Sequence, residues 1–292
     1  MRKFFRRHQG RGSYDLFSSY SHYLPGPKDI VKLFLFFLLG AILGNLVNMG
    51  LDAFLGKDFS SAYGTVISYP IMFIPAMLYA SVRSRLNDYS TPEVKLDSND
   101  FGALGGFKLS LVAIFATIAL AFITEPVVSL LPKMPEWMED IMTAMLDGSP
   151  LWITLISVSV FAPFFEEWLC RGIILRGLLS RQMNPVSAIA ISSVFFAILH
   201  LNPWQAIPAF LLGSLFGYVY YRTGSLKLTM LMHCVNNTIA VALHKAPALK
   251  EAETFMDVLS PWAYWCVWAA CLIIVACSLL IFRMKKESPL QQ

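Results

Sequence analysis

Two adjacent glutamates and an arginine lie where an apolar stretch of this sequence reads as a membrane helix. Glu166 and Glu167 fall within residues 151–169, and Arg171 follows one helical turn after Glu167. An ionised side chain in hydrocarbon costs roughly 2.5–3.5 kcal/mol on insertion scales, so charged residues there are rare and usually functional. Glu167 and Arg171 are four residues apart and can form an ion pair on a helix. Because Glu166 is rotated by about 100° from Glu167, we expect one neutralised carboxylate and one available for acid–base chemistry.

Two further apolar stretches carry polar side chains at helical spacing. His200 follows Phe196 by four residues, and His233 precedes Asn237 by four. A single histidine in a membrane helix is usually a hydrogen-bonded packing residue. Burying two imidazoles, two carboxylates, a guanidinium and amides together is too costly unless they share one hydrated pocket. We therefore expect the three stretches to meet at one site.

The chemistry of such a pocket is hydrolysis of an acyl bond. Glu166 would take a proton from water, and a histidine would hold that water or donate to the leaving amine. His233 and Asn237 would supply hydrogen-bond donors to a developing oxyanion. The sequence contains no GxSxG pattern, and its five cysteines lie in apolar stretches without CxxC spacing, which indicates buried free thiols.

Other functions fit the same residues. A transporter or proton-coupled carrier would use Glu166 and the histidines as a proton relay. Inverted internal repeats are typical of such carriers, and we find none in the sequence. A catalytically inactive membrane scaffold is the third reading.

The composition indicates an all-α, polytopic membrane protein. Hydrophobic residues make up 56% of the 292 residues and charged residues 14%, with a mean hydropathy of +0.57. We predict a bundle of about eight transmembrane helices in a single domain at 30–283, between a basic cytoplasmic tail at 1–29 and a short cytoplasmic tail at 284–292. The predicted spans are 30–51, 64–83, 107–131, 150–174, 186–202, 204–221, 226–243 and 261–282.

The distribution of basic residues predicts the orientation. Eighteen of the 23 Lys and Arg fall in segments on the N-terminal side of the membrane and four in segments on the other side. The remaining one, Arg171, lies in the fourth predicted span. The positive-inside rule then places both termini in the cytoplasm of a multi-pass cell-membrane protein. The net charge of +4 is explained by this asymmetry, so we expect no nucleic-acid partner. The pattern of residues 134–147 predicts an amphipathic helix that lies on the outer membrane interface. This helix would act as a substrate gate or only pack at the interface. Gly213 and Gly217 indicate helix packing.

Three motifs in order resemble those of one known family. Glu166-Glu167-x-x-x-Arg171, Phe196-x-x-x-His200 and His233-x-x-x-Asn237 are similar to the motifs of the CPBP family, which includes CAAX prenyl endopeptidases and Abi-type bacteriocin-processing or immunity proteins. The resemblance covers the motif-bearing core, about 150–243. It implies an intramembrane endopeptidase, a hydrolase acting on a membrane-associated protein or peptide with a lipidated C-terminus or a leader sequence. It also implies roles for the motif residues: Glu166 as catalytic base, His200 as water-holding residue, His233 and Asn237 as oxyanion hole, and Glu167, Arg171 and Phe196 as support.

The sequence leaves the metal and the depth of the site open. Proteins of this family are also called metalloproteases, because Glu166, His200 and His233 could bind zinc. HExxH is absent and an asparagine is a poor zinc ligand, so we expect a metal-free glutamate mechanism, with zinc as the alternative. Counting ~1.5 Å per residue, His233 lies ~10 Å and His200 ~21 Å from the cytoplasmic start of its span. These depths disagree unless Pro163 and Pro203 break their helices or the predicted span ends are wrong.

Overall fold

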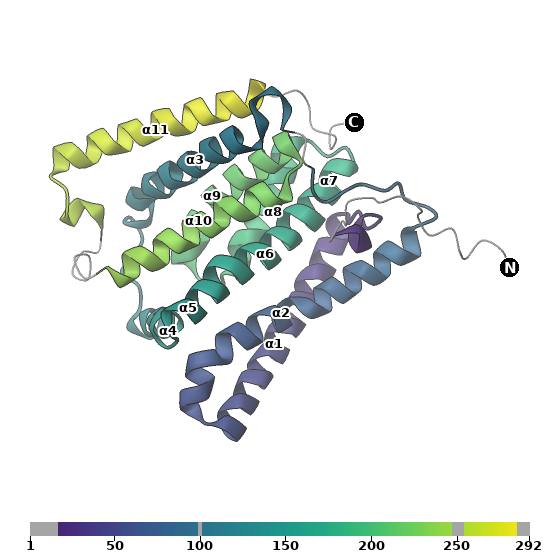
Figure 1. Cartoon of the computed structure of the whole chain (residues 1–292), viewed down its shortest axis with the longest axis horizontal. Coiled ribbons are helices and arrows are strands. Elements are labelled where there is room, and N and C mark those ends of the chain that lie inside the picture. Colours follow the sequence, from purple (N-terminus) through teal and green to yellow (C-terminus); the bar gives the residue numbers. More distant parts are fainter. Residues whose placement is uncertain (1–16, 99–100, 247–253, 285–292) are drawn as a thin grey trace.

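All regular elements in the described part of the chain are helices. The computed structural model describes residues 17–98, 101–246 and 254–284. The long helices are α1 Pro27–Leu55, α2 Lys57–Asn87, α3 Gly105–Val128, α8 Pro185–Leu199, α9 Pro203–Thr223, α10 Leu226–Lys245 and α11 Pro261–Met284, together with a composite helix at Leu151–Ser180 that we call the central helix (Figure 1). This arrangement confirms the all-α prediction.

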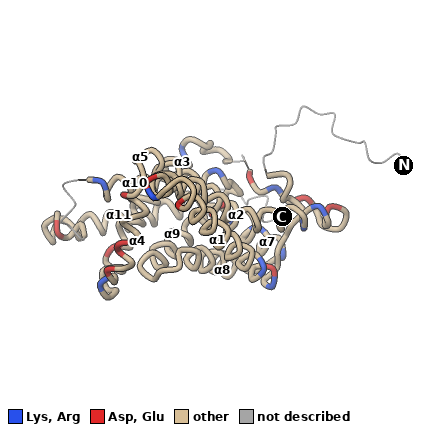
Figure 2. The backbone as a smooth tube through the Cα atoms, turned by 90° about the horizontal axis from the view of Figure 1, so that it is seen from below, with Lys and Arg blue, Asp and Glu red and all other residues tan. Residues whose placement is uncertain are grey.

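Six helices within the described residues are long and apolar enough to cross a membrane. They are the helices at Pro27–Leu55, Lys57–Asn87, Gly102–Val128, Leu151–Ser180, Leu226–Lys245 and Pro261–Met284. Of the other two predicted spans, α8 has 15 residues, fewer than the ~20 that a bilayer needs, and α9 has 21 but is less apolar. Charged residues gather towards the ends of the bundle (Figure 2). The polytopic membrane class is therefore confirmed, with six clear spans instead of eight.

The α1–α2 hairpin and the α3–α11 pair lie on opposite sides of the bundle. Figure 1 shows the hairpin splayed from the rest, and the central helix, α8, α9 and α10 lie between the hairpin and the pair. Helix α4 (Glu136–Asp147) leads into the central helix and exposes Trp137, Ile141 and Met145. It ends at Asp147, which accepts hydrogen bonds from Lys245 and His244 at the end of α10. The predicted amphipathic helix at 134–147 is therefore present.

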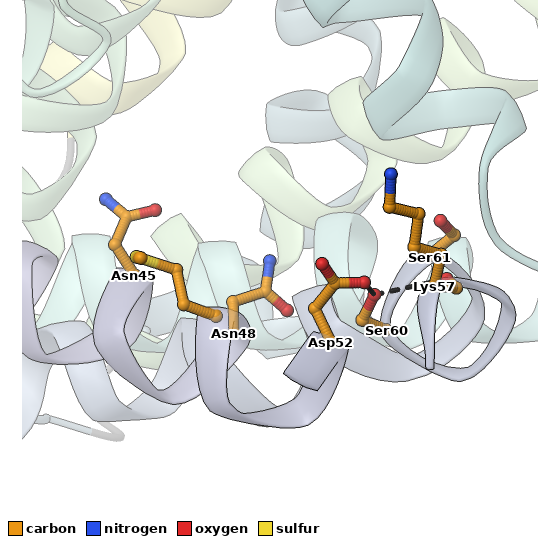
Figure 3. Close-up of a pocket in the computed structure, with 7 residues that line it drawn as sticks. Asn45, Asn48, Asp52, Lys57, Ser60 and Ser61 are labelled. Atoms are coloured by element: carbon orange, nitrogen blue, oxygen red, sulfur yellow. Dashed lines mark hydrogen bonds between the residues drawn. The ribbon is translucent and has the colours of Figure 1, made fainter. Parts of the chain in front are cut away.

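Small residues bring α1 and α2 into close antiparallel contact. The pairs that face each other are Gly40–Met72, Gly44–Ser68, Asn48–Gly64 and Asp52–Ser60. A Cβ atom added at Gly40 would lie 1.9 Å from the Met72 carbonyl oxygen, so only glycine fits there. Near the loop, the two helices border an open pocket of about 320 Å³ lined by Asn45, Asn48, Met49, Asp52, Lys57, Ser60 and Ser61 (Figure 3). Because Ser68 and Met72 face α1, the neighbouring Tyr69 and Phe73 can turn towards the central helix.

The segment before α1 is packed into the bundle. Tyr23 is 1% exposed, and Phe17 and Ser21 are also buried. Arg176 of the central helix is fully buried and donates hydrogen bonds to the backbone carbonyls of Tyr20, Ser21, Tyr23, Val94 and Gly172. The predicted tail at 1–29 is thus wrong for residues 17–29, since α1 begins at Pro27 and 17–26 are fixed to the central helix. Residues 1–16 and 285–292 lie outside the described residues, so the rest of both predicted tails is not addressed.

We predict that Arg176→Met strongly destabilises the protein. Losing the guanidinium removes the donor of the Tyr23 and Val94 carbonyls, at about 1–3 kcal/mol each, so the free energy of unfolding should fall by about 3 kcal/mol or more. The Tyr20 and Ser21 carbonyls keep a backbone N–H donor and lose only their second hydrogen bond. Thermal unfolding in detergent measures this, and chymotrypsin should cleave faster at Tyr20 and Tyr23. The control is Arg181→Met, because the exposed Arg181 bonds only the Leu24 carbonyl among the contacts of the described residues. Equal effects of the two substitutions would contradict the proposed importance of Arg176.

Candidate active site

The central helix contains two wider π-helical segments on either side of the glutamates. They are Leu155–Phe161 and Trp168–Leu175, and between them Ala162–Glu167 is α-helical. The Ala162 N–H bonds the Ser157 carbonyl, five residues back, and the next residue, Pro163, has no N–H to donate. The Val158 carbonyl is therefore open to a partner outside the helix. Asn237 of α10 fills this role, since its Nδ2 donates to that carbonyl at 2.8 Å.

Glu167 and Arg171 form a fully buried ion pair, as their spacing predicted. Arg171 Nη1 donates to Glu167 Oε1 at 2.7 Å, and both side chains are 0% exposed. Arg171 Nη2 donates to the Gly213 carbonyl at 2.9 Å, and the guanidinium lies over the Phe196 ring at 4.6 Å. A Cβ atom at Gly213 would come within 3.0 Å of Nη2, so the glycine of α9 permits this approach.

His233 lies between the two glutamates. Its Nδ1 is 3.1 Å from Glu167 Oε1, and its Nε2 is 3.9 Å from Glu166 Oε2. A carboxylate paired with arginine can only accept, so Nδ1 carries the hydrogen in this contact. Nε2 is then left facing Glu166 across a gap that is too long for a hydrogen bond.

Glu166 has a partner that the sequence did not reveal. Its Oε1 accepts a hydrogen bond from the hydroxyl of Tyr69 on α2. Its Oε2 is buried and has no hydrogen-bond partner in the described structure. The two adjacent glutamates therefore have different surroundings, as predicted, but Glu166 is held on one side. No local pattern marks Tyr69, which lies 97 residues before Glu166.

Phe196 links the two histidines. Its ring is edge-on to His200 at 5.1 Å between centroids and edge-on to His233 at 5.4 Å. His200 directly follows the last residue of α8, and its Nδ1 bonds the Phe196 carbonyl at 3.0 Å. Among the described contacts, none joins His200 directly to either glutamate. His200 thus meets the rest of the site only through the ring of Phe196.

Neither Pro163 nor Pro203 simply breaks a helix, as the depth estimate had considered. Pro163 adjoins a π-helical segment inside the central helix, and Pro203 is the first residue of α9. A tight turn at Leu201, which has a φ of 55°, joins α8 to α9. The Trp204 indole N–H bonds the Pro132 carbonyl at 2.8 Å, so this turn lies beside the segment that follows α3.

The three residues considered for zinc do not converge on one point. Within the described residues, no group of three His, Cys, Asp or Glu side chains is placed to hold a metal ion. His200 is turned to its own helix, and the ring of Phe196 contacts both histidines. The metal-free mechanism stays a prediction.

The fold and site define a helical membrane protein with a buried cluster of two glutamates, an arginine and a histidine. Residues 148–239 match the family described as "Type II CAAX prenyl endopeptidase Rce1-like". This segment contains all three motifs, and the match confirms the resemblance to CPBP intramembrane proteases; it covers less than half of the chain. No curated protein and no solved structure gave a match. The match supports intramembrane endopeptidase activity in general.

We predict that the two glutamates contribute differently to stability. Glu167→Gln and Arg171→Leu each remove one member of a buried pair, which typically costs about 3–5 kcal/mol. Glu166→Gln keeps the shape and an oxygen that can accept from Tyr69, so its unfolding temperature should stay near that of the wild type. Thermal unfolding of the three variants in detergent measures the difference. A loss of stability in Glu166→Gln equal to that in Glu167→Gln would contradict this assignment.

We also predict that Asn237 stabilises the central helix. Asn237→Ala leaves the Val158 carbonyl without its donor and should lower the free energy of unfolding by about 1–3 kcal/mol. In a Pro163→Ala background the new backbone N–H can bond within the helix, so the same substitution should cost less. Asn236→Ala is the control, because Asn236 donates only to Asn237 Oδ1 among the described contacts. An unchanged unfolding temperature in Asn237→Ala would show that the amide has no structural role.

Proposed function

We propose that this protein is an intramembrane endopeptidase in which Glu166 is the general base. The observation that carries the proposal is the asymmetry of the two buried glutamates. Glu167 is paired with Arg171, whereas Glu166 is bonded by the neutral hydroxyl of Tyr69 and faces His233 with Oε2. Both glutamates have a buried Oε2 without a hydrogen-bond partner in the described structure, so the difference between them is the cation at Glu167. A positioned carboxylate in a water-poor site can take a proton from water during attack on a carbonyl.

In the proposed reaction, a water molecule gives its proton to Glu166 Oε2 while its oxygen attacks the scissile carbonyl carbon. The carbonyl π electrons move to oxygen and form a tetrahedral oxyanion. When the C–N bond breaks, the electron pair returns to the carbonyl and Glu166 gives the proton to the leaving amine. The carboxylate is thereby regenerated, and the peptide is cleaved with one water consumed.

The other motif residues would stabilise these charges. His233 donates to the oxyanion from Nε2 when it is doubly protonated, with Nδ1–H still held by Glu167. One amide hydrogen of Asn237 is used by the Val158 carbonyl, so the second is the one that would serve the oxyanion. His200 bonds its helix through Nδ1, which leaves Nε2 to accept from the attacking water.

The proposal extends to the substrate, the cofactor and the location. The substrate is a membrane-associated protein or peptide, with a lipidated C-terminus or a leader sequence. We take the reaction to be metal-free, as the lack of an HExxH pattern in the sequence led us to expect. The protein lies in the cell membrane with both termini in the cytoplasm.

We predict that Glu166→Gln lowers peptide hydrolysis at least ~100-fold, the lower end for losing a general base. Membranes containing the wild type or Glu166→Gln are compared by mass spectrometry of newly formed protein termini, with EDTA present throughout. Cleavage products should accumulate with the wild type only. The fastest-cleaved sequence is then synthesised as an internally quenched peptide, and its hydrolysis is measured in proteoliposomes.

Several outcomes would contradict the proposal. If Glu166→Gln is active while Glu167→Gln folds and is inactive, Glu167 is the base. Wild-type activity that disappears in EDTA and returns with zinc would favour a metalloprotease. No cleavage in either sample, together with proton-coupled uptake in proteoliposomes, would favour a carrier.

A further inference from the structure

We propose that Tyr69 is a positioning residue that selects which oxygen of Glu166 acts as the base. This inference rests on the proposed function. Tyr69 belongs to α2 and lies outside residues 148–239, the segment that matches the endopeptidase family. The α1–α2 hairpin would then supply part of the site.

The contact between Tyr69 and Glu166 gives the two oxygens of the carboxylate different roles. The hydroxyl donates to Oε1, and a carboxylate has only two oxygens. Proton uptake is therefore directed to Oε2, the oxygen that faces His233. Without the hydroxyl, the proton could also be held on Oε1, which points towards α2, or the carboxyl could rotate about its last bond.

Aromatic packing holds the Tyr69 ring in this position. Its centroid is 5.7 Å from that of Phe73, one turn further along α2. The Phe73 ring is in turn stacked on Phe165 at 5.2 Å with an interplanar angle of 16°. Phe165 directly precedes Glu166, so the packing of α2 on the central helix places the hydroxyl next to the carboxylate. Phe37 of α1 contacts the same Phe73 ring at 5.3 Å and connects the hairpin to this cluster.

A positioning role of Tyr69 differs from general structural support in the kinetic constant that it changes. Tyr69 bonds Oε1 of Glu166, and the other oxygen, Oε2, is the one near His233, so we expect loss of the hydroxyl to leave substrate binding unchanged. It should change the fraction of molecules whose Glu166 is oriented for proton transfer. Loss of the hydroxyl is thus expected to lower kcat and leave KM unchanged, because small errors in the position of a catalytic group reduce the rate strongly.

The test uses Tyr69→Phe, which removes one oxygen atom and keeps the ring. With the quenched peptide in proteoliposomes, kcat should fall by about 10-fold or more while KM stays within about twofold. The matched control is Tyr63→Phe, which removes a hydroxyl from the same helix. The Tyr63 ring lies near Phe59 and near Trp152 of the central helix, and both kinetic constants should be unchanged. A kcat within twofold of the wild type, or an equal loss in Tyr63→Phe, would overturn the proposal.

A stability cycle tests the contact independently of catalysis. Tyr69→Phe should lower the unfolding temperature by about 2 °C or more in the wild type, because a buried carboxylate oxygen loses its donor. In a Glu166→Gln background the decrease should be less than half as large, since the neutral amide depends less on that donor. Equal decreases in both backgrounds would show that the two side chains are not coupled. If the wild type cleaves no peptide, the protease function fails, and this cycle still decides whether Tyr69 holds Glu166.

Discussion

The site depends on neutralising one buried carboxylate so that a second can stay reactive beside it. Two unpaired carboxylates on neighbouring residues in a water-poor interior would repel each other and favour a shared proton. Arg171 removes that problem by bonding Glu167, and the guanidinium is itself held by the Gly213 carbonyl and the Phe196 ring. One cation thus connects the central helix, α8 and α9. The arrangement of the remaining motif residues follows from this fixed point.

His233 shows how the pair orients its surroundings. Glu167 Oε1 accepts from both Arg171 and the imidazole Nδ1, so the ion pair sets the direction of the histidine ring. The opposite ring nitrogen is turned to Glu166 as a result. Asn237, one turn further along α10, fixes the distance to the central helix through the Val158 carbonyl. The π-helical turn and Pro163 make that carbonyl available, so a feature that weakens the helix also creates the attachment point for α10.

Local spacing predicted those parts of the site that lie on one helix. Glu167 and Arg171 are four residues apart, and helical geometry alone places them in contact. Phe196 with His200, and His233 with Asn237, follow the same rule. The sequence could not predict that Phe196 contacts both histidine rings or that Asn237 bonds a backbone carbonyl, because these contacts depend on how helices pack. Tyr69 was missed for the same reason: a tyrosine in an apolar helix is ordinary until its neighbours in space are known.

The span count was also limited by what hydropathy measures. α8 is apolar but only 15 residues long, and α9 contains Gly213, Gly217 and Tyr220, which are buried in the protein interior. Hydropathy counts an apolar stretch as a span without showing how long its helix is or whether the helix faces lipid. The segment 17–26 was assigned to a tail because residues 1–29 are basic and aromatic and end at Pro25, Gly26 and Pro27. Its carbonyls, and not its side chains, make the contacts with Arg176, so no side-chain pattern could indicate them.

The contacts of Arg176 also affect the order in which the chain can fold. They join backbone groups of residues 20–23 to a side chain that is synthesised more than 150 residues later. Contacts this distant in sequence form late, because the ends of a long loop must first be brought together. Residues 20–23 are therefore synthesised early but fixed late. Until the central helix is in place, their carbonyls lack the guanidinium donor that Arg176 supplies.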